Sequence, residues 1–160
     1  MHSHPSAQPL TSPPPAPIPG PVAWLGYGGL LPFVTLAAVG LLAPTTPWWS
    51  AALLAYGAVI LSFVGALHWG FAMAQSGLST AERTRCFVWS VVPSLMAWPA
   101  TLLPPAGGAA LLVTGFVAHL VQDHRLAART SLPAWYLPLR WRLTTTACVC
   151  LAVGAMAASR

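Results

Sequence analysis

Two histidines and one aspartate are the residues of this chain whose types and positions favour chemistry inside an apolar segment. His68 and His119 each lie in a long apolar stretch, and Asp123 follows His119 by four residues. An ionisable side chain in a membrane helix is costly and is by default a candidate for function. Two facing histidines on different helices can ligate a b-type haem or relay a proton to a quinone. His119 can also reach Asp123, because residues four apart share one helix face.

Each histidine also has an ordinary interpretation, as a side chain near the membrane interface that is hydrogen-bonded to a backbone carbonyl or to water. One histidine per helix has no discriminating spacing, so both interpretations stay open. Ser62 joins the candidate polar site with His68, His119 and Asp123, because it belongs to a stripe of small residues on the His68 segment. Such a stripe permits close approach of another helix, within the monomer or across a homodimer.

No arrangement of residues indicates catalysis. The chain shows no nucleophile beside a base, no metal-ligand spacing and no phosphate-binding loop. The three cysteines, Cys86, Cys148 and Cys150, are interpreted as small buried hydrophobic residues. Cys148 and Cys150 would point about 200° apart on a helix and could not bind one metal together. The sequence therefore predicts a protein that is not an enzyme and has no metal site, and it leaves the cofactor unknown.

The environment of these residues follows from the distribution of charge. The chain has seven basic residues, two acidic residues and a net charge of +5. Apart from Arg160, all of them lie in the stretches 82–85 and 123–142. No separate basic domain presents the arginines, so nucleic acid is not predicted as a partner. The apolar remainder is long enough to cross a bilayer repeatedly, at roughly 20 residues per crossing.

The sequence therefore predicts an all-α fold, an integral membrane helical bundle of about five transmembrane helices. Proline-containing turns near residues 44–48 and 104–108 separate the members of two helix pairs. The predicted helices cover residues 22–43, 49–75, 86–103, 107–122 and 143–158.

Two parts of the chain are distinguished by composition. Residues 1–21 are rich in proline and are predicted to form a disordered cytoplasmic arm, and residues 22–158 are predicted to form the transmembrane domain. The arm is not interpreted as a signal peptide, because no basic residue precedes the first apolar run. The loops 76–85 and 123–142 hold six arginines, and positive charge marks the cytoplasmic side. The amino terminus is therefore predicted to be cytoplasmic and the carboxyl terminus periplasmic.

The stretch 132–142, with the sequence LPAWYLPLRWR, contains two prolines and is predicted to be a poor continuous helix. Its aromatic and basic residues suit the headgroup layer, where arginine can meet anionic lipid. We expect a short interfacial tether that leads into the last helix. Its main residues are Trp135, Tyr136, Arg140 and Arg142. Trp89 is likewise interpreted as an aromatic anchor at the inner membrane interface.

A weak internal repeat is also present. The pattern AALLxxGxV occurs at residues 51–59 and again at 109–117. Pro32 and Pro93 lie in the helices that precede these two segments. The two hairpins can thus be interpreted as parallel repeats about an axis normal to the membrane, but AALL is a common run in such sequences and chance is the favoured explanation of the match. A small-solute carrier with Pro32, Pro93 and Ser62 around a central cavity is one function that this pattern permits.

Four phrases of the sequence are distinctive when taken together: LGYGGLLPF at 25–33, YGAVILSFVG at 56–65 with His68-Trp69-Gly70, SVVPSLxAW at 90–98 and LPxWYxxLRxxLT at 132–144. They resemble one family, the small multi-pass membrane proteins of bacteria and mitochondria grouped as a domain of unknown function with transmembrane protein 69. The resemblance covers about residues 24–155 and implies a bacterial inner-membrane protein whose family has no settled biochemical role. The family pattern tolerates another residue at the position of His68, which argues against a universal haem ligand there. No catalytic residue can be transferred.

Three functional hypotheses follow from these observations. The leading one is a non-enzymatic protein of the bacterial cytoplasmic membrane that acts through association with a membrane complex or with itself. The first alternative is a haem- or quinone-associated redox subunit that uses His68 and His119. The second alternative is the small-solute carrier built from two repeated hairpins. The expected partners are the lipid bilayer and a membrane protein or a second copy of the chain.

Overall fold

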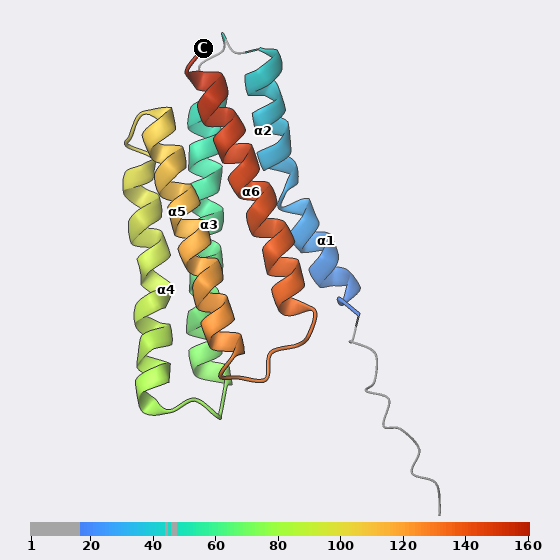
Figure 1. Ribbon diagram of the computed structural model, residues 1–160, viewed down its shortest axis with the longest axis vertical. Coiled ribbons are helices and arrows are strands. Elements are labelled where there is room, and N and C mark those ends of the chain that lie inside the picture. The colour runs from blue at the N-terminus through green and yellow to red at the C-terminus, as the bar shows by residue number, and fades with distance from the viewer. Residues whose placement is uncertain (1–16, 44, 46–47) are drawn as a thin grey trace, which may run out of the picture.

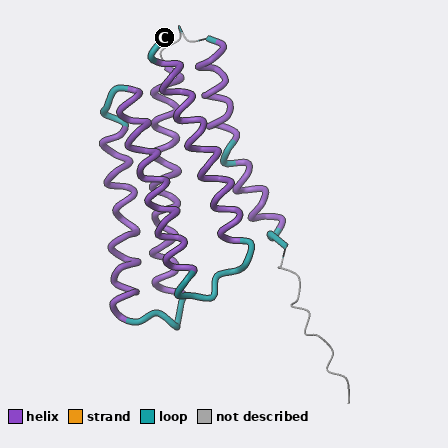
Figure 2. The backbone as a smooth tube through the Cα atoms, in the orientation of Figure 1, coloured by secondary structure: helices purple, strands orange, loops and turns teal. Residues whose placement is uncertain are grey.

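The computed structural model describes residues 17–43, 45 and 48–160, and every regular element within them is a helix. The helices run up and down as a bundle with short connections (Figure 1), and the described part of the chain contains no strand (Figure 2). The predicted all-α membrane bundle is thereby confirmed. The helices are α1 (Gly20–Gly28), α2 (Leu31–Leu42), α3 (Trp48–Ala74), α4 (Thr80–Ala100), α5 (Pro105–Ala127) and α6 (Tyr136–Ala158).

Two sequence-based predictions fall wholly or partly outside the described residues. The predicted disordered arm at 1–21 is described only from residue 17 onwards, and Gly20 already belongs to α1. The predicted turn at 44–47 is described only at Thr45, which the structure also places in a turn. The structure therefore adds little to either prediction beyond an earlier start of the first helix.

The first membrane segment is broken between α1 and α2. The break falls at Gly29 and Leu30, and Pro32 follows in the first turn of α2. In one continuous helix, residue 32 would donate its N–H to the carbonyl oxygen of Gly28, and proline has no N–H to donate. The hydroxyl of Tyr56 on α3 donates to the carbonyl oxygen of Gly29 at 2.8 Å, so the break is fixed against a neighbouring helix. Together α1 and α2 form one apolar segment, Gly20–Leu42.

Four segments are long and apolar enough to cross a membrane by length and composition: the combined α1 and α2, then α3, α5 and α6. Helix α4 is the remaining member of the bundle and does not meet this criterion. Its first two turns contain Glu82, Arg83 and Arg85, and these charges lower its mean hydropathy. It is nevertheless 21 residues long and packs along α3. The count of about five bundle helices agrees with the sequence, and α4 is the least apolar of them.

The last two helices are longer than predicted. The segment expected at 107–122 is the 23-residue helix α5, and the segment expected to begin at 143 is α6, which begins at Tyr136. The prediction of a non-helical tether through residue 142 is therefore wrong from Tyr136 onwards. Pro138 lies in the first turn of α6, where a backbone N–H has no intrahelical partner, so the missing donor does not disturb the helix.

The centre of the bundle is filled by large apolar side chains. Helix α3 packs against α2, α4, α5 and α6 and contributes the most buried residues. Interiors of this kind are packed as densely as organic crystals, so a change of one side chain is felt by its neighbours. The largest fully buried apolar side chains are Phe33, Trp49, Leu61, Leu112 and Leu151.

Two glycines are required where helices approach most closely. A Cβ atom at Gly65 of α3 would lie 2.8 Å from the side chain of Pro93 on α4. A Cβ atom at Gly108 of α5 would overlap the carbonyl oxygen of Ala100 at the end of α4. The contacts of α4 with α3 and with α5 therefore depend on a missing side chain at each site. Pro93, which the carrier hypothesis assigned to a cavity, packs against α3.

The connections that follow α3 and α5 lie at one end of the bundle, and the carboxyl terminus lies at the opposite end (Figure 1). The first connection, residues 75–79, leads into the charged start of α4, and the second, residues 128–135, leads into α6. We call this end, with its two connections and the adjoining helix turns, the charged end. The predicted alternation of charged and uncharged loops thus corresponds to two ends of one bundle.

Candidate functional site

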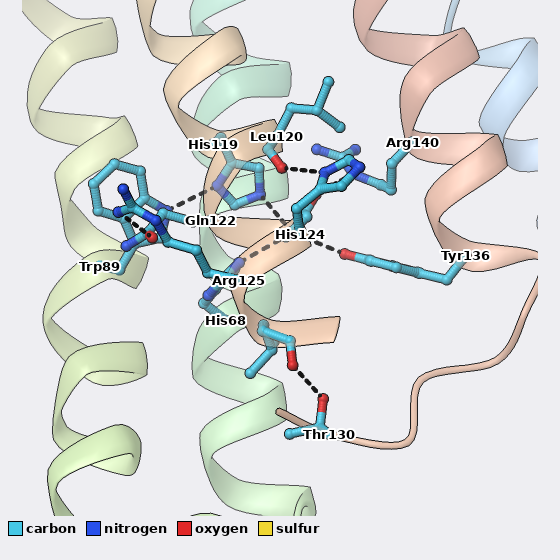
Figure 3. A network of polar contacts seen from close by, with 12 residues as sticks. His68, Trp89, His119, Leu120, Gln122, His124, Arg125, Thr130, Tyr136 and Arg140 are labelled. Atoms are coloured by element: carbon cyan, nitrogen blue, oxygen red, sulfur yellow. Dashed lines mark hydrogen bonds and ion pairs between the residues drawn. The ribbon is translucent and has the colours of Figure 1, made fainter. Parts of the chain in front are cut away.

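His68, His119 and Asp123 meet in the interior of the bundle, near the charged end. Figure 3 shows how His68 and His119 lie, with Tyr136 and Arg140 nearby. The Nε2 atom of His68 lies 3.0 Å from Oδ1 of Asp123, and Nε2 of His119 lies 3.6 Å from the same oxygen. The two imidazole rings meet edge to face with their centroids 4.9 Å apart. His68 is 2% exposed, and His119 and Asp123 are fully buried. The structure therefore brings together the three ionisable residues that the sequence singled out.

Two further donors reach Asp123 from α6. The hydroxyl of Tyr136 donates to Oδ1 of Asp123 at 3.1 Å, and Nε of Arg140 donates to Oδ2 at 2.7 Å. Arg140 is only 5% exposed, so this ion pair is taken out of solvent. Hydrogen bonds between charged groups are roughly twice as strong as neutral ones. We refer to His68, His119, Asp123, Tyr136 and Arg140 as the Asp123 cluster.

Helical spacing explains how three helices supply this cluster. His119 and Asp123 are four residues apart on α5, and Tyr136 and Arg140 are four residues apart on α6, so each pair lies on one helix face. His68 comes from the last two turns of α3. The ring of Phe71 makes edge-to-face contacts with both His68 and Tyr136, at centroid distances of 5.9 and 5.7 Å. An aromatic wall thus lies beside the polar groups.

A fourth helix fixes the orientation of His119. The indole N–H of Trp89 on α4 donates to Nδ1 of His119 at 3.1 Å. Because an indole nitrogen is only a donor, Nδ1 must carry a lone pair, and the proton of the neutral imidazole resides on Nε2. That N–H points towards Asp123 Oδ1 at a distance too long for a good hydrogen bond. Trp89 therefore selects the tautomer that presents a donor to the carboxylate.

The same geometry argues against a metal at this site. The ligand atoms of His68, His119 and Asp123 all lie within 4.8 Å of one another, a grouping that is compatible with a metal ion. A metal at Nε2 of His119 would require the proton on Nδ1, where it would face the N–H of Trp89. A metal would also lie close to the guanidinium of Arg140, a positive charge already paired with the carboxylate. The donor set thus fits an internal hydrogen-bonded network better than a cation.

The other predicted site residues lie outside the cluster. Ser62 is half-buried on α3 and makes no hydrogen bond to the Asp123 cluster. Trp135 precedes α6 and contacts the ring of Tyr136, with centroids 6.3 Å apart. Arg142 is exposed and donates to the hydroxyl of Tyr27 on α1 at 3.1 Å. Of the four tether residues, Arg140 and Tyr136 are therefore internal, whereas Arg142 remains on the surface.

Sequence reasoning missed Tyr136 and Arg140 as partners of Asp123, and it also missed the role of Trp89. Trp89, Tyr136 and Arg140 were interpreted as residues of the membrane interface, where aromatic and basic side chains are common. The missed signal was charge balance, because a carboxylate in an apolar helix needs a cation near it. Arg140 lies 17 residues after Asp123, across one helical connection, and could have been proposed on that ground.

Outside the membrane-spanning segments, the start of α4 is held by a capping box. Ser79 accepts from the backbone N–H of Glu82, and the Glu82 carboxylate accepts from the backbone N–H of Ser79. The Ser79 hydroxyl also donates to the Glu82 carboxylate at 2.7 Å. The hydrogen bonds that the carboxylate accepts from the hydroxyl and the backbone N–H of Ser79 hold the pKa of Glu82 below its ordinary value of 4.5. Arg83 donates to the carbonyl oxygens of Ala72 and Gln75 at the end of α3. The connection between α3 and α4 is therefore well ordered by local contacts.

Comparison with known proteins agrees with this membrane architecture. The family model described as "Protein of unknown function (DUF3429)" matches residues 18–156. The chain is 35% identical over 135 residues to "Transmembrane protein 69" of Xenopus tropicalis, an alignment that covers 81% of the chain and 51% of that relative. The chain thus spans about half the length of this curated relative. No solved structure matches the chain.

Proposed function

The chain belongs to the DUF3429 family of membrane proteins, and we propose that it acts without catalysis, through association with a membrane complex or with a second copy of itself. The observation that carries this proposal is the low burial of the first membrane segment against the rest of the bundle. Its apolar window, within Gly20–Leu42, is 17% buried, whereas the corresponding windows of α3, α5 and α6 are 33–39% buried. Helix α1 has no buried residue at all. This apolar helix is thus available for a partner helix.

The polar interior supports a non-enzymatic role. Asp123 accepts hydrogen bonds from His68, Tyr136 and Arg140, and its charge is balanced by the guanidinium of Arg140. A group that is neutralised and saturated in this way holds helices together. It presents neither a free base to a substrate nor a free acid for coupled transport. The cluster therefore serves as a clasp between α3, α5 and α6, and the surface remains as the place of function.

The proposed location is the bacterial cytoplasmic membrane, with the amino terminus in the cytoplasm and the carboxyl terminus in the periplasm. The support is the clustering of arginines at the charged end, because cytoplasmic loops are enriched in positive charge. Reporter fusions test the orientation. A fusion after residue 130 should report the cytoplasm and one after residue 105 the periplasm, and the same compartment for both would contradict the arrangement.

Photocrosslinking in native membranes tests the proposed association. A photoreactive residue at position 24 replaces Trp24, which is 82% exposed on α1, and the matched control replaces Phe63, which is 63% exposed on α3. We expect a protein adduct from position 24 and only lipid labelling from position 63. A particle larger than the monomer should also be recovered in nanodiscs formed directly from membranes. Exclusively lipid labelling at both positions, with a monomeric particle, would contradict the proposal, as would solute transport by the purified protein.

The redox alternative has less support for haem. A porphyrin must lie between its two axial ligands, whereas the rings of His68 and His119 are only 4.9 Å apart and both face one oxygen of Asp123. No room for the macrocycle remains between them without rearrangement of α3 and α5. The absorption spectrum of the detergent-purified protein should therefore lack a Soret band. A band that disappears on substitution of either histidine would restore the haem hypothesis, and a quinone would need a separate binding assay.

The carrier alternative lacks the lining it requires. Pro93 of α4 packs against Gly65 of α3. Ser62 is half-buried on α3 and does not belong to the Asp123 cluster. The centre between the hairpins holds Leu61 and Leu112, both fully buried. The internal repeat at residues 51–59 and 109–117 stays a prediction. The packed centre between the two hairpins leaves no pathway for a solute.

A further inference from the structure

A pocket of about 360 Å³ opens at the charged end, beside the Asp123 cluster. Its volume falls within the roughly 300–1,000 Å³ that is typical of small-molecule sites. His68 of α3 contributes to its wall, but most of the wall comes from α4, α5 and the turn after α5. Its polar and aromatic lining includes His68, Glu82, Arg85, Trp89, Arg125 and Arg129.

Regular spacing on α4 and the position of two arginines at the end of α5 bring these side chains to the same place. Arg125 lies in the last turn of α5, and Arg129 lies in the turn that follows the helix. On α4, Glu82, Arg85 and Trp89 recur at intervals of three and four residues. Residues at such intervals share one helix face. Helices α4 and α5 pack against each other, so the two polar faces border one pocket. The sequence analysis used these arginines only to assign the sides of the membrane.

The pocket carries an excess of positive charge. Glu82 pairs with Arg129 at 3.5 Å, and Arg125 donates to the neutral side chain of Gln122 at 3.1 Å. Among the described residues, Arg85 forms no hydrogen bond or ion pair. Arg85 and Arg125 are exposed and have no carboxylate of their own. Two positive charges are therefore left to interact with a ligand.

We propose that this pocket binds the phosphate group of an anionic lipid from the leaflet at the charged end. A guanidinium presents a planar fork of donors that matches phosphate oxygens, and it is the preferred group for such recognition. Arg85 and Arg125 supply two such forks from the two helices that border the pocket. The ligand class is thus a lipid with a net negative phosphate headgroup, such as phosphatidylglycerol.

Position and lining favour a lipid over a soluble anion. The pocket lies at the charged end, beside the charged start of α4 and the end of α5, where we expect the headgroup layer of a membrane crossed by the apolar segments. Beside the arginines, its wall contains the apolar side chains of Leu78, Cys86 and Leu126 and the ring of Trp89. An amphiphile satisfies both parts of this wall, whereas inorganic phosphate satisfies only the arginines. Anionic lipids are also concentrated in the cytoplasmic leaflet, the side that the arginines indicate.

Native mass spectrometry of the purified chain tests the proposal by counting the lipid molecules that remain bound. Phosphatidylglycerol is compared with phosphatidylcholine, and the double variant R85A/R125A is compared with R142A, whose arginine is exposed but lies outside the pocket. Arg85 and Arg125 are each expected to contribute about fivefold, the typical effect of a basic residue held against an anionic headgroup, so the double variant should lose about 25-fold in phosphatidylglycerol binding. R142A should bind within about twofold of the unmodified chain. The variant R85K/R125K keeps the charge but loses the fork and should be intermediate.

Soluble competitors separate the two sources of phosphate. Glycerol 3-phosphate and inorganic phosphate, added in excess, should leave phosphatidylglycerol bound. Displacement by either competitor at concentrations comparable to the lipid would overturn the assignment to a lipid. Equal retention of phosphatidylglycerol and phosphatidylcholine would overturn the proposal, and so would an equal loss in R142A and R85A/R125A. Thermal unfolding of each variant confirms that it is folded, which we expect because Arg85 and Arg125 are exposed.

Discussion

Replacement of Asp123 by asparagine tests whether the buried ion pair holds the bundle together. The amide oxygen of asparagine can still accept from His68 and Tyr136, but its NH2 group would face Nε of Arg140, which is also a donor. Arg140, only 5% exposed, would keep its charge without a counter-charge. Removal of one partner from a buried ion pair costs about 3–5 kcal/mol. We expect D123N to lower the free energy of unfolding by about that amount.

A double-mutant cycle isolates the contribution of the pair itself. The second single variant, R140M, keeps much of the arginine volume but removes its charge, and the double variant D123N/R140M leaves no unpaired charge behind. The free energy of unfolding is measured by titration with a denaturing detergent, followed by the far-ultraviolet circular dichroism of the helices. We expect the double variant to lose at least about 2 kcal/mol less than the sum of the single variants, since residues in one ion pair couple by about 0.5–3 kcal/mol.

The control is R142M, two residues further along α6. Arg142 is exposed and its partner is the hydroxyl of Tyr27, so its loss should change the unfolding free energy by no more than about 0.5 kcal/mol. Additive effects of D123N and R140M, within about 0.5 kcal/mol, would show that the two side chains do not interact. The description of the Asp123 cluster as a clasp would then be incorrect.

Three further perturbations test other contacts. W89F keeps an aromatic ring but removes the donor to Nδ1 of His119. We expect the free energy of unfolding to fall by about 0.5–1.5 kcal/mol in the same detergent titration. An unchanged free energy of unfolding would mean that the hydrogen bond is absent. G108A should destabilise the bundle by about 1–3 kcal/mol because its Cβ meets the backbone of α4. G70A, with open space around it, should instead be neutral or stabilising by up to about 1 kcal/mol, because alanine has a higher helix propensity than glycine. The pKa of Glu82 is lowered in the folded chain, so the helix cap that it forms is intact above the ordinary value of 4.5 and is lost as the pH falls through the lowered pKa. Amide hydrogen exchange in the first turn of α4, corrected for its intrinsic pH dependence, should therefore accelerate as the pH falls through that lowered pKa. No acceleration is expected between pH 6 and pH 8.

The membrane helices could be predicted because the cost of placing charge in lipid is a local property of the sequence. The absence of charge from residues 1–81 and the grouping of later charge into two stretches were sufficient to locate five helices. Helix ends were less predictable. Pro138 was interpreted as a helix breaker, although proline is tolerated in a first turn, and α6 consequently begins at Tyr136 rather than at residue 143.

The candidate site could be predicted only within single helices. The proximity of His119 to Asp123 followed from their spacing on α5. The contact with His68 was one possibility among several, because sequence indicates the depth of a residue in the membrane but not the direction in which it faces. Arg140 and Trp89 were assigned to the interface for the same reason. Their depth is compatible with headgroups, and only the rotation of α6 and α4 turns them inwards.

The ion pair between α5 and α6 has a consequence for biogenesis. Asp123 and Arg140 lie towards the charged end, so the cost of each unpaired charge in lipid is smaller than the roughly 2.5–3.5 kcal/mol that applies at the bilayer centre. The two helices are joined by the short connection 128–135, so they can enter the lipid as one hairpin whose charges neutralise each other. During synthesis, before Arg140 has been added to the chain, the carboxylate of Asp123 on α5 has no arginine to neutralise it. We therefore expect α5 to be held more firmly in the membrane once α6 has emerged and supplied Arg140.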